Sequence, residues 1–270
     1  FRVCQNSSCY TTEPYEGDCG VNSVLKRILE TGYVRAANGE LVKLYGNIPP
    51  EEGEFLQKII AEVKPKVSLE VGLAFGISAL FICDALTKVQ ALRHIIIEPD
   101  DWGGLNNLKE AGYEQLIELY NMPSFRALPR LEAEGRKIDF AFIDGMHTFD
   151  YVMLDFFYID RLLRVGGVVV FDDANWESIR KVCRYIVTNR SYTVFSSSQS
   201  DRRFSLRHKL LFDAPVISKH FRRIAKPEIL EPDFKLGLAD CRYIAFMKER
   251  DDVTGDGSNG TRRFDFHRDF

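Results

Sequence analysis

The chain has 270 residues, of which 45% are hydrophobic and 28% are charged, and its formal net charge is −3. This length and composition fit one large α/β domain with extensions, and the slightly acidic balance argues against a general nucleic-acid or membrane-surface binder. No apolar run approaches the roughly 20 residues of a membrane span, and the N-terminus lacks a signal peptide's apolar stretch, so we expect a cytoplasmic protein with a small-molecule partner.

Residues 1–50 are expected to form a cap or lid outside the core sheet. Residues 1–20 are polar and turn-rich, and the cysteines among them, Cys4, Cys9 and Cys19, form no Cys-x-x-Cys pair, which favours a mobile segment over a metal site. Residues 22–29 have helical spacing, which Gly32 ends. Cys83, Cys183 and Cys241 fall in helix or strand patterns and are expected to be small buried hydrophobes.

Residues 51–250 alternate between helix and strand patterns, which predicts a doubly wound α/β sheet. A helix begins near residues 48–52 and ends before Lys64. The expected strands cover residues 67–71, 94–98, 116–120, 138–144, 168–172, 192–196 and 241–247. Residues 201–235 are basic and irregular and are expected to form an insert on the acceptor side, whereas residues 251–270 are expected to be a mobile or surface tail.

The junction after the first of these strands predicts a small-ligand site. Gly72 and Gly76 let the backbone turn tightly and approach a ligand at the start of an apolar helix. Dinucleotide sites use Gly-x-Gly-x-x-Gly, whereas here three residues separate the glycines and Glu70 precedes the first. A carboxylate would repel a pyrophosphate but suit a cationic sulfonium ligand with an ammonium group. The alternative is a turn whose glycines serve packing alone.

Acidic residues end three of the predicted strands, at the edge where open α/β sheets bind ligands. Glu98 could accept both hydroxyls of a ribose, or it could cap the helix after Pro99. Asp144, Asp172 and Asp173 would meet at one edge and could hold a divalent cation, most simply Mg²⁺. Alternatively, Asp172 and Asp173 only cap the next helix.

The arrangement from Glu70 to Gly76 resembles motif I of the Rossmann-like, class I S-adenosylmethionine-dependent methyltransferases. From Glu51 to Met247 the chain resembles metal-dependent O-methyltransferases of the catechol and caffeoyl-coenzyme A type, and the bacterial methyltransferases of sugars and antibiotics. The resemblance implies a mostly parallel seven-stranded sheet with helices on both faces and an antiparallel last strand. It also implies roles for single residues: Asp144, Asp172 and Asp173 on the metal, Ser78 on the methionine carboxylate, Ser124 beside the adenine, and Asp144 also near the cofactor.

His147 is the main departure from this family pattern, because catechol-type enzymes have a lysine base at the corresponding place. Histidine can accept a hydroxyl proton near neutral pH, so we predict that His147 is the general base. A metal-ligand role and a structural role remain alternatives. His94 has no comparable neighbours in the sequence and is expected to be structural.

The predicted function is methyl transfer from S-adenosylmethionine to a hydroxyl of a small molecule, such as a catechol, a sugar or a natural-product diol, with a divalent metal assisting. The expected partners include no nucleic acid and no membrane, and a homo-oligomer is left open. Two other functions remain: a NAD-dependent oxidoreductase on the same kind of sheet, or a non-catalytic nucleotide-binding or interaction protein.

Overall fold

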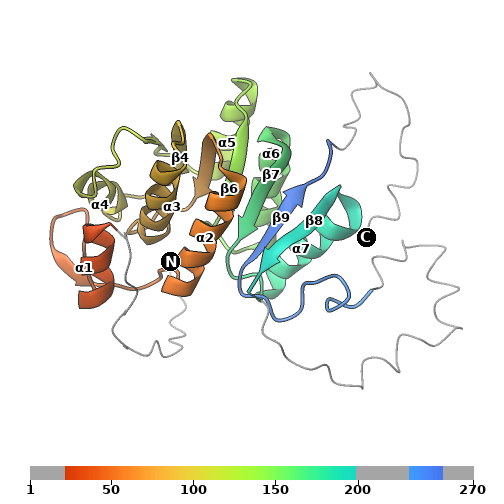
Figure 1. Cartoon of the computed structure of the whole chain (residues 1–270), viewed down its shortest axis with the longest axis horizontal. Coiled ribbons are helices and arrows are strands. Elements are labelled where there is room, and N and C mark those ends of the chain that lie inside the picture. Colours follow the sequence, from red (N-terminus) through yellow and green to blue (C-terminus); the bar gives the residue numbers. More distant parts are fainter. Residues whose placement is uncertain (1–21, 199–230, 252–270) are drawn as a thin grey trace, which may run out of the picture.

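A seven-stranded sheet with helices on both faces forms the core of the computed structural model, which describes residues 22–198 and 231–251 (Figure 1). The strand order is β5-β4-β3-β6-β7-β9-β8. The strands are β3 Val67–Val71, β4 Arg93–Ile97, β5 Ile117–Tyr120, β6 Ile138–Ile143, β7 Leu163–Phe171, β8 Tyr192–Ser197 and β9 Ile244–Lys248. All pairings are parallel except those of β9 with β7 and β8. The predicted fold class is therefore confirmed.

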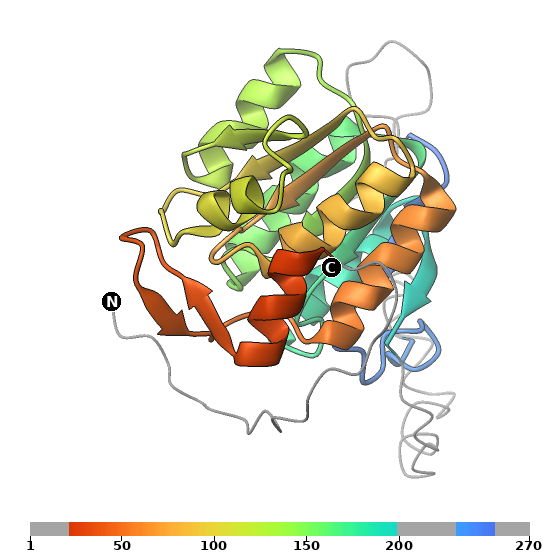
Figure 2. The ribbon, with the colours of Figure 1, turned by 60° about the vertical axis from the view of Figure 1, so that its left-hand side comes forward.

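The apolar core has two layers, one on each face of the sheet, because successive side chains of a strand point to opposite faces. One layer packs one face of the sheet against α1 Ser23–Thr31, α2 Pro50–Val63, α3 Ile77–Lys88 and α4 Gly104–Glu110. The other packs the opposite face against α5 Ser124–Ala133, α6 Phe149–Leu162 and α7 Glu177–Asn189. Figure 2 shows α1, α2 and α3, coloured red to yellow, in front of the sheet. Because successive side chains of a strand point to opposite faces, neighbours such as Leu69 and Glu70 enter different layers.

The described part of the N-terminal segment, residues 22–49, contributes no strand to the seven-stranded sheet. Asn22 caps α1 by accepting the N–H of Val24, and Gly32 ends the helix with φ 69°. A hairpin that was not predicted follows, with β1 Tyr33–Arg35 antiparallel to β2 Leu41–Lys43. Val24, Leu25 and Ile28 are buried in the same core as α3, so this segment is packed onto the domain; its role as a lid stays a prediction.

Several details of the chain-order prediction can be compared with the structure. The last strand begins at Ile244 instead of 241, because residues 237–243 form turns. Cys83, Cys183 and Cys241 are buried, as expected. The segment with Cys4, Cys9 and Cys19, most of the 201–235 insert and nearly all of the 251–270 tail lie outside the described residues. Within residues 22–198 and 231–251, no helix has the length and apolarity that crossing a membrane requires.

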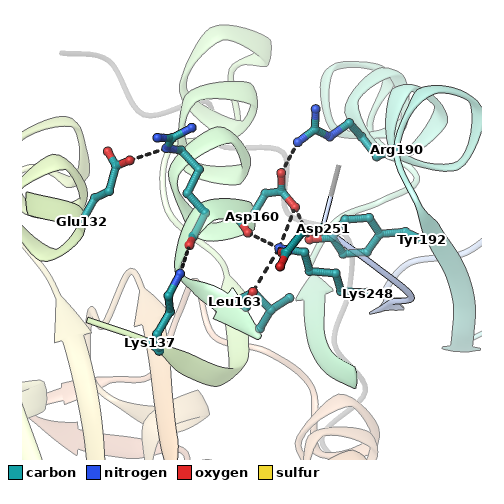
Figure 3. Close-up of polar contacts among 9 residues, drawn as sticks. Glu132, Lys137, Asp160, Leu163, Arg190, Tyr192, Lys248 and Asp251 are labelled. Carbon is teal, nitrogen blue, oxygen red and sulfur yellow. Dashed lines mark hydrogen bonds and ion pairs between the residues drawn. The ribbon is translucent and has the colours of Figure 1, made fainter. Parts of the chain in front are cut away.

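A buried polar network lies at the end of the sheet where the parallel strand β7 begins (Figure 3). Lys248, at the end of β9, is only 3% exposed and donates from Nζ to the carbonyls of Asp160 and Leu163, at 2.6 and 3.0 Å. The Asp160 carboxylate also accepts the hydroxyl of Tyr192 at 2.6 Å and pairs with Arg190. These bonds join α6, β7 and β8 to the antiparallel strand β9. The network lies at the opposite end of the sheet from the carboxyl ends of the parallel strands.

Candidate active site

The turn between β3 and α3 is tight because other parts of the backbone fill the space where side chains would lie. Gly72 has φ 95°, and a Cβ there would lie 2.1 Å from the carbonyl oxygen of Asp144. Gly76 has φ 82°, and its Cβ would lie 3.1 Å from the carbonyl oxygen of Gly104. Both conformations favour glycine. The tight turn is confirmed, but the groups that approach these glycines are protein backbone, so chain packing accounts for both.

A cavity of about 510 Å³ opens beside this turn, within the range of small-molecule sites. It lies at the carboxyl ends of β3, β4 and β6, where the strand order changes direction, as open α/β sheets place their ligands. The predicted site residues in its wall are Gly72, Ser78, Glu98, Ser124, Asp144 and His147. Residues from four separate loops therefore meet around one space.

Glu98 holds the glycine turn in place. One of its carboxylate oxygens accepts the backbone N–H groups of Leu73 and Ala74 at 2.8 and 3.0 Å. The other accepts the N–H of Asp100 at 3.0 Å, so the side chain also orders its own loop. A carboxylate has about four lone-pair sites, and these bonds use three of them. The side chain is thus fixed at the cavity wall, with acceptor capacity left for a ligand hydroxyl.

Glu70 lies behind the cavity wall. It is fully buried, accepts the hydroxyl of Ser78 on one oxygen, and its other oxygen lies 3.1 Å from Nε2 of His94. Direct contact of Glu70 with a cofactor remains a prediction, whereas its contact with Ser78 is part of the structure. His94, expected to be structural, is fully buried, and its ring contacts Glu70. The apolar context of β4 gave no sign of this contact, because it depends on the register of β4 against β3.

Asp144, His147 and Asp172 form the one group in the described part of the chain with metal-ligand spacing. Their ligand atoms all lie within 4.8 Å of one another. His147 Nε2 lies 3.5 Å from oxygens of both Asp144 and Asp173, and this buried nitrogen has no hydrogen-bond partner. The group contains Asp144 and Asp172 of the predicted metal set, and His147, whose ligand role was the stated alternative; Asp173 is not part of it.

Two further charged residues border this group, and sequence reasoning did not single them out. Glu52 of α2 is fully buried, and neither of its oxygens has a hydrogen-bond partner. Arg242, which precedes β9, lies 3.7 Å from Glu52 and 3.9 Å from both Asp172 and Asp173. Glu52 appeared in the sequence only as a first-turn helix acid, and no local pattern could have indicated its burial against strand ends.

The crowding of acids raises their pKa values. Burial, followed by repulsion from Asp172, raises the pKa of Glu52 to about 10. Burial and the same neighbour raise the pKa of Asp144 well above its usual value, and that of Asp173 is also raised, mainly by burial. Like charges that face each other in a recess destabilise their ionised forms, which is the situation that a bound divalent cation relieves. The oxygen-rich group, together with the unpartnered His147 nitrogen, fits such an ion.

Aromatic side chains lie in the cavity wall, at Phe75 and Trp102, and beside His147, at Trp176. The ring of Trp176 lies 5.3 Å from that of His147 and is 52% exposed. On the other side, Trp102 packs edge-on against Phe75 at 5.8 Å. Trp176 follows the Asp172–Asp173 pair by only a few residues, so its position in the sequence was a usable signal that had been overlooked. These rings offer apolar walls to a planar ligand.

Residues 69–174 match a family model described as a methyltransferase domain. Among curated proteins, the chain is 29% identical over 145 residues to tapetum-specific methyltransferase 1 of Arabidopsis thaliana, covering 50% of this chain and 60% of the relative. It is 31% identical over 134 residues to a caffeoyl-CoA O-methyltransferase of Stellaria longipes, covering 47% of this chain and 54% of the relative. The chain thus spans little more than half the length of these relatives.

Among solved structures, an O-methyltransferase from Bacillus cereus in complex with SAH is similar, with a TM-score of 0.55 and 20% identity, covering 66% of this chain and 84% of that chain. At that identity the likeness concerns the fold, which is the Rossmann-like methyltransferase fold. With the sequence matches, it confirms the predicted resemblance to class I S-adenosylmethionine-dependent O-methyltransferases.

Proposed function

We propose that this protein is an S-adenosylmethionine-dependent enzyme that transfers a methyl group to a hydroxyl of a small molecule. The observation that carries the proposal is a single cavity that joins Ser78 and Glu98 on one side to Asp144 and His147 on the other. A cofactor held in the first part and an acceptor held in the second would meet in that space. The methyltransferase-domain match over residues 69–174 supports this function over a NAD-dependent one.

The cofactor would occupy the half of the cavity next to the glycine turn. Glu98, already fixed by Leu73, Ala74 and Asp100, would accept a ribose hydroxyl with its remaining lone-pair site. Ser124, at the start of α5, would lie beside the adenine, and Ser78 beside the amino-acid part. The Bacillus cereus structure, which contains SAH, supports the choice of ligand.

A divalent cation would be held by Asp144 and Asp172, with Asp173 and His147 as adjacent donors. When bound, such an ion lowers the pKa of an acceptor hydroxyl and fixes its direction. Oxygen-rich sites of this kind suit Mg²⁺. The residues themselves would orient the acceptor, because the ligand atoms of Asp144, His147 and Asp172 lie within 4.8 Å of one another, and Asp144 and His147 line the cavity.

His147 would accept the hydroxyl proton of the acceptor at Nε2. This nitrogen is buried, has no hydrogen-bond partner, and lies 3.5 Å from Asp144 and Asp173, whose negative charge would stabilise the imidazolium that forms. The same geometry is compatible with a ligand role for His147, which the variants described in the Discussion distinguish. The oxygen would then attack the methyl group in line with the departing sulfur, and orientation in the closed space would supply most of the rate.

The acceptor class that we propose is a catechol or another vicinal diol, including sugar and natural-product diols. Two adjacent oxygens can reach one cation together, and the exposed ring of Trp176 next to His147 offers a flat apolar surface. The similarity to a caffeoyl-CoA O-methyltransferase supports the catechol end of this range.

Calorimetric titration with S-adenosylhomocysteine tests the cofactor. We expect a dissociation constant in the micromolar range, and a loss of roughly 10-fold or more in Glu98→Gln, since a hydrogen bond to a charged group contributes about 1.5–3 kcal/mol. Glu114→Gln, an exposed acid outside the cavity, is the matched control. Binding of NAD without binding of S-adenosylhomocysteine would refute the proposed function. Transfer of labelled methyl to a panel of diols then identifies the acceptor class.

A further inference from the structure

Helix α6 exposes large apolar side chains on the face of the molecule opposite α1 to α4. The helix lies in the layer with α5 and α7 and contacts both of them. Its inner side chains, such as Phe156 and Ile159, are buried in this layer. On its outer side, Leu154 and Phe157 are 37% and 52% exposed. Apolar side chains that gather on a solvent-facing surface are typical of an interaction site.

Four exposed residues follow one line along this outer side, which we call the α6 stripe: Asp150, Leu154, Phe157 and Arg161. They are spaced by four, three and four residues. With 3.6 residues per helical turn, this spacing keeps all four within about 60° of one another around the helix axis. The stripe is about 17 Å long, at 1.5 Å of rise per residue. It is therefore one continuous surface, with a charge at each end.

The α6 stripe is complementary to its own reversed order. An acid, Asp150, begins it, and a base, Arg161, ends it. When two copies of the stripe lie antiparallel, with a two-fold axis midway between Leu154 and Phe157, Asp150 of each copy faces Arg161 of the other. Leu154 of each copy then faces Phe157 of the other. A two-fold interface requires this relation, in which each contact occurs twice with the roles exchanged.

Arg161 is placed to take part in such a contact. Its Nε donates to Glu132 of α5, and its guanidinium carbon lies 5.7 Å from the centre of the Phe157 ring. A guanidinium carries five N–H donors, and Nε supplies only one of them. The positive charge is therefore held over the apolar part of the α6 stripe, with donors beyond the bond to Glu132.

We propose that the α6 stripe is the centre of a homodimer interface, in which it packs antiparallel against the α6 stripe of a second copy of this chain. Helices that cross at about 20° stay in contact over several turns, which lets both charged pairs form. A stable interface buries about 800 Å² on each partner, and two helices alone cover less, so α5 and α7 beside α6 add to the contact. The inference does not depend on the proposed cofactor.

Sedimentation velocity over a range of protein concentrations tests the dimer. The wild type should dimerise reversibly with a dissociation constant of roughly 10 µM, because interfaces of small area are weak. Leu154→Asp puts an acid into the apolar centre twice per dimer and should weaken association by roughly 100-fold or more. Leu92→Asp, the same change at an exposed leucine outside α6, is the matched control and should dimerise like the wild type. A dimer that survives Leu154→Asp would overturn the proposal, and a monomeric wild type would overturn it in favour of another occupant of the stripe.

Two charge reversals test the antiparallel order. Asp150→Arg leaves the α6 stripe with two bases and Arg161→Asp leaves it with two acids, so each variant alone should dimerise roughly 10-fold more weakly than the wild type, or worse. Mixed in equal amounts, the two variants should associate with each other about as strongly as the wild type, because every charged pair is complementary again. Misfolding cannot produce that recovery, since neither chain changes on mixing. A mixture that fails to associate while the wild type dimerises would refute the antiparallel arrangement.

Discussion

Glu52→Gln should alter how the stability of the metal-free protein depends on pH. The Glu52 carboxyl is fully buried beside Asp172, and burial first, then this neighbour, raises its pKa from an ordinary 4.5 to about 10. The folded protein therefore keeps a proton on Glu52 that the unfolded chain releases above about pH 4.5. Because the native state binds more protons, its free energy of unfolding must fall as pH rises through this window.

The size of the effect follows from one proton. Well inside the window, the unfolding free energy falls by about 1.4 kcal/mol per pH unit for each extra proton of the native state. Between about pH 6 and pH 8, Glu52 should thus cost the wild type about 2.7 kcal/mol. A glutamine amide has the shape of the protonated acid and cannot titrate, so Glu52→Gln should lack this component and gain that much relative to the wild type over the same range.

Urea denaturation with a chelator present, at several pH values across this range, measures the difference. The chelator removes cations that Asp144 and Asp172 could bind, so that both proteins are compared in the metal-free state. Glu51→Gln, the same chemical change at the exposed neighbouring residue, should follow the wild-type curve. Parallel curves for the wild type and Glu52→Gln would refute the reasoning, because they would show that Glu52 binds no extra proton in the folded state.

Three further expectations follow. If His147 is the base, His147→Ala should lower turnover by roughly 100-fold or more with little change in cofactor affinity. The variant should also lose the acid limb of the pH–rate profile. Rescue of its activity by excess Mg²⁺ would instead identify His147 as a metal ligand. Chelator-treated enzyme should lose methyl transfer and regain it with Mg²⁺, and full activity after exhaustive chelation would reduce Asp144, Asp172 and Asp173 to structural acids. Lys248→Met should lower the unfolding free energy by about 1–3 kcal/mol, because the buried carbonyls of Asp160 and Leu163 would lose their donor while Arg190 still pairs with the Asp160 carboxylate. Calorimetric melting tests this, with exposed Lys109→Met as control.

Local sequence patterns were sufficient to find most of the fold. Mostly apolar runs such as residues 138–143 become central strands because both of their faces are buried, and the apolar spacing of Phe55, Leu56, Ile59 and Ile60 puts one face of α2 into the core. The β1–β2 hairpin was missed because its strands have three residues each, too few for a periodic signal, although its Asn38–Gly39 turn was visible. The edge of the site was predictable as well, since acids that follow parallel strands meet at one end of a sheet.

Motifs and their spacing were enough to point to loops that meet at one end of the sheet in the structure: the Gly72–Gly76 turn, Glu98, and the acids from Asp144 to Asp173. The connections between these side chains could be known only from the folded chain. Whether His94 meets Glu70 depends on the register between two strands that are 26 residues apart in the chain, and the burial of Glu52 depends on how α2 packs against strand ends. Local propensity fixes the direction in which a side chain leaves its own element. The groups that this side chain contacts, and therefore its protonation state, depend on packing between elements that are distant in sequence.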